Sequence, residues 1–266
     1  MKKLRIFSIM LFMVSTAAFV VFQVYIRVVQ DIVPPKVTCE SEEFTVAVDA
    51  PESALFEGVT AKDSRSGDVT DTLVVEEMSA FTEEGKRVLT YAAVDESKNV
   101  GRCERVLVYK GYEPPTFNLT SPLSFPVGRD ISVKSAITAE SVLDGDLSDN
   151  IKYTLESAIN TMEEGTYPIE FRVMDSGGKN VYLETEIEIY GREYASIEVT
   201  LSDYLVYVDK GDDFEAKKYY EGASLEEVDL SVNSNVNTKK EGVYYVDYVV
   251  SHGTSKGKSR LVVVVK

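Results

Sequence analysis

A unit of about 80 residues recurs three times in this chain, and the repetition limits the possible folds more than any other feature of the sequence. The first two copies share a Pro-Pro pair, Pro34-Pro35 and Pro114-Pro115, and an aspartate, Asp95 and Asp175. All three copies share a Glu-Gly pair, at Glu84-Gly85, Glu164-Gly165 and Glu241-Gly242. Self-similarity at a fixed period is typical of tandem modules. The chain is therefore expected to repeat one small domain.

The best-matched part of each copy reads as strand, turn, strand. In the second copy Tyr167, Ile169, Phe171 and Val173 alternate with polar residues or proline, and the third copy keeps this phase. A period of two is typical of a half-buried strand. No segment after residue 30 keeps a helical period. Short strands separated by turn residues predict antiparallel β-sandwiches.

The sequence Glu163-x-Gly165-x-Tyr167 favours an immunoglobulin-like sandwich. It fits a tyrosine corner, in which the hydroxyl bonds to backbone upstream. The alternative is ordinary β-hairpin chemistry. The predicted fold class is all-β: three tandem immunoglobulin-like β-sandwich domains after one N-terminal transmembrane helix. The domains are 1–30 (cytoplasmic tip and signal-anchor helix), 31–110, 111–191 and a divergent 192–266. Expected strands include 44–48, 72–76, 131–133, 151–155, 184–190, 196–201 and 205–208.

The helix is expected at residues 6–26, where 21 positions carry no charge. At about 1.5 Å per residue this length crosses a hydrocarbon core of roughly 30 Å. Lys2, Lys3 and Arg5 precede it, so the positive-inside rule places the N-terminus in the cytoplasm and the domains outside the cell. Arg27 follows it.

A cleaved signal peptide is the alternative, with Ser15 to Ala18 as a small-residue cleavage site. The apolar run continues past that site to Ile26, which favours an uncleaved anchor. Both interpretations export the rest of the chain.

The charge balance excludes a nucleic-acid binder. The chain has 44 acidic and 28 basic residues, a formal net charge of −16, and the part after residue 30 reaches −20 because residues 1–30 hold four basic residues and no acidic one. Phosphate backbones require clustered Lys and Arg. An acidic surface suits cations, basic partners or solubility.

Two strings in the first copy, GVTAKDSRSGDVTDTLVV and TYAAVDESKNVG, carry a family resemblance. They resemble the bacterial immunoglobulin-like repeats of Gram-positive surface proteins, which also occur in an insecticidal crystal protein and are similar to hyalin repeats. ITAESVLDGDLSDNI and FRVMDSGGKNV extend the resemblance to the second copy, whereas EGASLEEVDLSV in the third lacks the Gly-Asp turn. The resemblance implies an extracellular, non-enzymatic spacer or adhesion module and no particular ligand.

Cys39 and Cys103 lie on the first and last strands expected in the first copy, and such strands run side by side in sandwiches of this kind. An exported location favours a disulfide between them. Two buried free thiols are the alternative.

The acidic loops are a weak candidate for Ca²⁺, which requires six to eight oxygen ligands. Loops gathered at one pole of a sandwich would bring together Asp63, Asp68 and Asp95 in the first copy, and Asp144, Asp146 and Asp175 in the second. Asp-Gly and Gly-Asp are also ordinary turn formers, so solvated turns remain the alternative. No other cofactor is expected.

The third copy is rich in tyrosine, and Tyr219, Tyr220 and Tyr245 are weak candidates for exposed binding contacts. Filling of the core explains tyrosines equally well.

Catalysis is not expected, because a Ser-His-Asp or Cys-His arrangement would have to use His252, which has no adjacent nucleophile motif. The predicted function is a membrane-anchored cell-surface rod for binding, adhesion or spacing, with an unknown protein or glycan ligand. A carbohydrate-binding accessory module and a subunit of a cell-envelope assembly are the alternatives.

Overall fold

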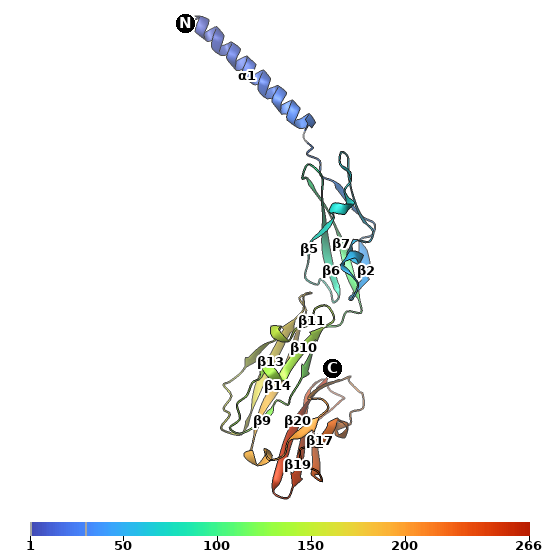
Figure 1. Cartoon of the computed structure of the whole chain (residues 1–266), viewed down its shortest axis with the longest axis vertical. Helices are drawn as coiled ribbons and strands as arrows, with labels where there is room; N and C mark the ends of the chain where they lie inside the picture. Colours follow the sequence, from blue (N-terminus) through green and yellow to red (C-terminus); the bar gives the residue numbers. More distant parts are fainter. Residues whose placement is uncertain (1, 30) are drawn as a thin grey trace. The chain divides into compact units, whose positions relative to one another are not determined.

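The computed structural model describes residues 2–29 and 31–266 (Figure 1). Met1 and Gln30, the ends of the predicted 1–30 segment, lie outside the described residues, as do the side chains of Lys2 and Arg27. Helix α1 (Lys2–Val29) contains the expected span. Its stretch Lys3–Ile26 has a mean hydropathy of 2.2 and buries none of its surface against the rest of the chain, so it is long and apolar enough to cross a membrane.

The first sandwich follows the helix and has two sheets. Their strand orders are β1-β3-β4 and β2-β7-β6-β5 (Figure 1). All neighbours are antiparallel except β2 and β7. The strands are β1 (Lys36–Cys39), β2 (Glu43–Ala47), β3 (Val59–Asp63), β4 (Gly67–Asp68), β5 (Val74–Met78), β6 (Lys86–Val94) and β7 (Val100–Lys110).

The second sandwich repeats this topology strand for strand. The orders β11-β10-β8 and β12-β13-β14-β9 reproduce those of the first, with β9 parallel to β14. The strands are β8 (Thr116–Leu119), β9 (Ser124–Pro126), β10 (Ile137–Ser141), β11 (Gly145–Asp146), β12 (Lys152–Leu155), β13 (Gly165–Met174) and β14 (Asn180–Tyr190).

The third sandwich keeps the larger sheet and reduces the smaller one to two strands. The orders are β15-β17 and β16-β20-β19-β18, with β16 parallel to β20. The strands are β15 (Val199–Leu201), β16 (Leu205–Val208), β17 (Tyr220–Ala223), β18 (Asp229–Ser234), β19 (Gly242–His252) and β20 (Ser255–Val265). Three tandem sandwiches after one N-terminal helix confirm the predicted fold class.

The expected strand at 131–133 is wrong. Those residues form an irregular segment that leads into a 3-10 helix at Lys134–Ala136. The strand that precedes this segment is β9. Val133 is nevertheless buried in the core. Its apolar character reflects burial of a loop and not pairing in a sheet.

The predicted tyrosine corner is confirmed in the second copy, and the third copy has the same contact. The Tyr167 hydroxyl donates to the carbonyl of Asn160 at 3.0 Å, and the Tyr244 hydroxyl donates to the carbonyl of Lys240 at 2.8 Å. Each bond ties the start of a long central strand to the preceding loop.

In the first and third copies, a buried tyrosine donates a hydrogen bond to a backbone carbonyl inside the sandwich. Tyr91 and Tyr248 are fully buried at equivalent places in β6 and β19 and donate to the carbonyls of Leu55 and Ala216. Phe171 fills the same place in the second copy without a hydroxyl. Removal from water raises the pKa of Tyr248, so its hydroxyl remains a donor throughout the ordinary pH range.

Tyr248→Phe is expected to destabilise the third sandwich by about 1 kcal/mol, because it leaves the Ala216 carbonyl without this donor. The free energy of unfolding, measured by urea denaturation of the full chain in detergent, checks this value. Tyr153→Phe removes a hydroxyl from an exposed tyrosine and is the control. Equal shifts in the two variants would contradict the assigned role of the Tyr248 hydroxyl.

The chain forms two compact units, Met1–Gly111 and Tyr112–Lys266. In the second unit two sandwiches share apolar contacts: Leu205 and Val262 of the third copy are buried in the core of the second. The opposite face of β20 packs Leu261, Val263 and Val265 into the core of the third copy. Strand β20 is therefore covered on both faces.

Charged residues extend this contact between the second and third copies. The Arg260 guanidinium contacts Asp247 of its own sheet at 2.7 Å, and Glu186 and Glu188 of β14 at 2.9 and 3.1 Å. Lys258 Nζ contacts Glu188 at 2.6 Å. Arg260 is only 7% exposed, so this cluster is largely removed from water. The two sandwiches are joined laterally through β14 and β20.

Candidate metal centre

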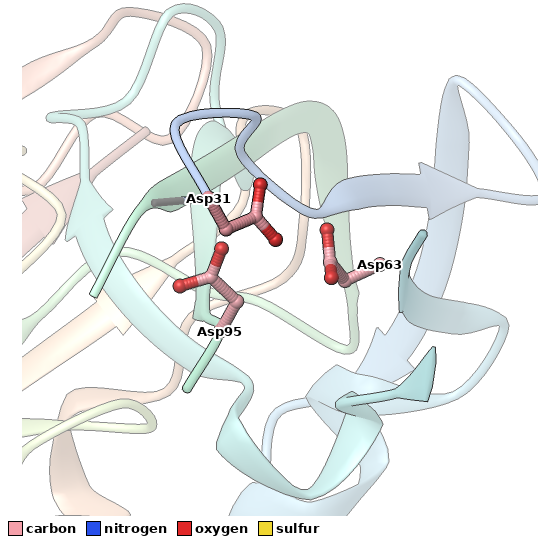
Figure 2. Close-up of side chains that lie close together, drawn as sticks. All are labelled: Asp31, Asp63 and Asp95. Carbon is pink, nitrogen blue, oxygen red and sulfur yellow. The ribbon is translucent and has the colours of Figure 1, made fainter. Parts of the chain in front are cut away.

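Three aspartates converge at one pole of the first sandwich. Asp31 comes from the segment between α1 and β1, Asp63 ends β3, and Asp95 follows β6. Figure 2 shows their side chains turned toward one another. One carboxylate oxygen of each lies within 4.8 Å of the others. Asp63 and Asp95 are buried and Asp31 is half-buried.

Backbone amides hold two of these carboxylates from the side away from the cluster. Asp63 Oδ1 accepts from the amides of Arg65 and Ser66 at 2.8 and 2.7 Å. These bonds favour the ionised form and hold the pKa of Asp63 below its ordinary value, with the Ser66 amide as the largest cause. Asp31 Oδ1 accepts from the amide of Val33 at 3.1 Å. Each residue thus closes a tight turn with Oδ1.

Asp95 is held by the turn that follows it. Its Oδ1 accepts from the amide of Asn99 and its Oδ2 from the Asn99 side-chain amide, both at 2.7 Å. The same side-chain amide donates to the backbone carbonyl of Asp31 at 3.1 Å. Asn99 therefore links the entry segment to the turn between β6 and β7.

Within this cluster, two carboxylate oxygens have no hydrogen-bond partner among the described residues. They are the buried Oδ2 atoms of Asp31 and Asp63. Buried polar atoms are nearly always partnered. A cluster of anionic oxygens with buried acceptors left over has the chemistry of a site for a hard cation.

The structure brings Asp63 and Asp95 together, as expected from the sequence, adds Asp31, which the sequence analysis missed, and leaves Asp68 outside the group. Asp68 is exposed and its Oδ1 accepts from the amide of Thr70 at 3.0 Å, a bond that helps lower its pKa, with the Thr70 hydroxyl as the largest cause. It is a turn residue. Asp31 is marked in the sequence only by its place ahead of Pro34-Pro35.

The second copy has no comparable group among its described residues. Ser141 ends β10 where Asp63 ends β3, and the Tyr112 hydroxyl donates to Asp175 Oδ2 at 2.6 Å. Asp144 Oδ2 accepts from the Ser176 amide at 2.9 Å. Asp146 Oδ1 accepts from the Ser148 amide at 2.9 Å, and its pKa is lowered chiefly by the Ser148 hydroxyl. Neutral hydrogen-bond donors thus satisfy Asp144, Asp146 and Asp175, the carboxylates expected at this pole from the sequence.

Cys39 and Cys103 form a disulfide, with a sequence separation of 64 residues. It joins the two sheets, since β1 belongs to the smaller sheet and β7 to the larger. The strand directly beside β7 is β2 and not the first strand β1, because the chain crosses from one sheet to the other between Cys39 and Glu43.

The three candidate contact tyrosines divide between two cores. Tyr219 and Tyr220 are half-buried against the core of the third copy, where Tyr219 stacks on Phe214 with ring centroids 5.7 Å apart. Tyr245 packs against the core of the second copy, 3.4 Å from the Thr185 hydroxyl. His252 is exposed at the end of β19, its Nδ1 3.2 Å from the carbonyl of Glu227.

The fold defines a protein of tandem immunoglobulin-like sandwiches, and its first sandwich is similar to a hyalin-repeat domain. Residues 30–108 match the model of the HYR domain. That match spans the first sandwich up to residue 108 in β7, and it includes the three aspartates and the disulfide. The HYR domain is a non-catalytic domain type. The match agrees with the hyalin-repeat side of the resemblance and does not extend to the insecticidal-protein type.

Solved structures of similar fold include extracellular and carbohydrate-binding modules. The protocadherin GammaB4 extracellular domain is 11% identical over 87% of this chain and 49% of its own length, with a TM-score of 0.23. The CBM51-2 and INT domains of Clostridium perfringens ZmpB, solved with GlcNAc, are 14% identical over 87% and 42%, with a TM-score of 0.23. Human CDH23 EC21-23 is 8% identical over 87% and 100%, with a TM-score of 0.24.

The chain spans about half the length of the protocadherin. No curated protein matches it.

Proposed function

We propose that this protein is a single-pass membrane protein whose α1 crosses the membrane with its N-terminus in the cytoplasm. The sandwiches then stand outside the cell, where they act as a non-catalytic binding, adhesion or spacer protein. The observation that carries the proposal is the helix itself: its apolar stretch Lys3–Ile26 has no surface buried by the β domains. In water such a surface is unstable, and a bilayer is the solvent it fits.

The disulfide supports an extracellular location. Cys39 and Cys103 are the two cysteines of the chain, and both are used in the bond. Disulfides persist in oxidising compartments and are rare in the cytosol. The disulfide favours sandwiches that lie outside the cytoplasm. Lys3 and Arg5 favour a cytoplasmic N-terminus, which also leaves the sandwiches outside.

The finer family assignment belongs to the same proposal. Repeated Gly-Asp turns at Gly67-Asp68 and Gly145-Asp146 form the two-residue strands β4 and β11 in equivalent places. This shared turn supports the assignment of both copies to the bacterial immunoglobulin-like surface repeats, of the kind seen in insecticidal crystal protein and hyalin repeats.

A protein partner suits the surface better than a stacked sugar. A sugar platform needs exposed aromatic rings side by side, and Tyr219 and Tyr245 pack on different cores. The acidic exterior favours a partner with basic residues through complementary charge.

Membrane extraction tests this function. The full chain, expressed in bacterial cells, is expected to remain in the membrane pellet after alkaline carbonate washing. External protease should digest residues 31–266 in intact cells. Mass analysis of the membrane-bound chain should find the N-terminus intact. A soluble chain beginning near Phe19 would instead show cleavage at the small residues that precede it, and would overturn the anchor.

A further inference from the structure

We propose that Asp31, Asp63 and Asp95 bind one Ca²⁺ ion, which fastens the segment after α1 to the first sandwich (Figure 2). This goes beyond the proposed function and does not rest on membrane insertion. The three residues come from three separate parts of the chain, and Figure 2 shows their carboxylates facing a common space.

The orphaned oxygens are the independent sign of a ligand. Asp63 is only 8% exposed, and its Oδ2 has no hydrogen-bond partner. The turn role of Asp63 uses Oδ1 alone. An anionic oxygen removed from water without a partner is unfavourable, and here the Oδ2 of Asp31 adds a second one. A cation between these atoms would satisfy both.

The donor set and its width select calcium. All three side chains offer carboxylate oxygens, which hard cations prefer. Opposite oxygens around Ca²⁺ stand about 5 Å apart, whereas around Mg²⁺ they stand about 4 Å apart. The three ligand oxygens lie within 4.8 Å of one another, a separation that the larger sphere accommodates. Water completes the coordination.

The second copy shows what the same pole looks like when no ion is required. The Tyr112 hydroxyl donates to Asp175 Oδ2, and Ser141 stands where the first copy has Asp63. The Asp63 carboxylate of the first copy thus corresponds to the Ser141 hydroxyl, and the Tyr112 hydroxyl supplies Asp175 with a hydrogen-bond donor. The negative charge in the first copy is a specific addition to a pole that folds without it.

The ion would act on the residues between α1 and β1. This segment already touches the sandwich at two points: Asn99 donates to the carbonyl of Asp31, and a Cβ on Gly101 would lie 1.8 Å from the carbonyl oxygen of Pro35. Those contacts hold the backbone. Calcium would fix the Asp31 side chain as well and so add a third attachment of residues 31–35 to the sandwich.

Equilibrium dialysis with ⁴⁵Ca²⁺ tests the proposal. The full chain is placed in nanodiscs of zwitterionic lipid after removal of metal by chelator. We expect one class of site per chain, with a Kd of about 10⁻⁴ to 10⁻³ M, the range of extracellular modules. Asp63→Asn should weaken binding at least tenfold. Asp68→Asn and Asp175→Asn remove the same charge elsewhere and should leave binding unchanged.

Hydrogen exchange of the wild-type chain gives a readout that needs no variant. Added Ca²⁺ should slow exchange of the Val33 and Asn99 amides, which donate to Asp31 and Asp95. The equivalent amides of the second copy should not respond. The proposal is overturned if Asp63→Asn and Asp68→Asn bind Ca²⁺ alike, if Ca²⁺ leaves the Val33 amide unchanged, or if Mg²⁺ binds as tightly as Ca²⁺.

Discussion

Arg260→Met is expected to destabilise residues 112–266 by about 3–5 kcal/mol, the cost of removing one partner from a buried charge cluster. Arg260 is 7% exposed and neutralises Asp247, Glu186 and Glu188 together. Without the guanidinium these carboxylates face one another across the contact between β14 and β20. Urea denaturation of the full chain, followed by hydrogen exchange of peptides from β20, measures the effect.

Arg102→Met is the matched control for this prediction. Arg102 forms a two-bond contact with Glu76, but both side chains are substantially exposed. Exposed ion pairs contribute little because water and salt screen them, so this variant should unfold at nearly the wild-type urea concentration. If Arg260→Met also unfolds there, the buried cluster does not stabilise the second unit.

Loss of the disulfide is expected to destabilise the first sandwich by about 4 kcal/mol in the chain-entropy treatment of a loop of 64 residues. The bond joins two sheets that are otherwise held together by the apolar core around Leu89 and Leu107. The variant Cys39→Ser/Cys103→Ser should therefore unfold at a lower urea concentration in residues 31–110. Peptides from residues 112–266 serve as the internal control and should not change. A reduced chain that retains its unfolding midpoint would contradict the prediction.

The repeat and the alternation of residues were sufficient to predict the sandwiches. Strand β13 alternates buried Ile169, Phe171 and Val173 with more exposed neighbours, as a period of two requires. The same rule is weaker in β20, where Leu261 to Val265 form a continuous apolar run. Such a run is typical of a strand covered on both faces, and it was the available sign that the third copy contacts the second.

The candidate metal centre could be predicted only in part. Asp63 and Asp95 follow strands whose ends meet at one pole, so the repeat places them together. Asp31 lies ahead of the first strand, and its approach depends on Asn99 and Gly101 on a distant turn. Sequence pattern does not encode such contacts. Asp68 was included because the sequence does not show that its side chain is exposed and lies outside the cluster.

The two-sided burial of β20 restricts the residues that this strand can carry. In a repeat that stands alone, the outward positions of this strand tolerate most polar residues. Here Lys258, Arg260, Val262 and Val264 must match the acidic and apolar outer face of β14. Selection on this shared surface would act on both copies at once, so substitutions at Glu186 or Glu188 should be inherited together with changes in the last strand.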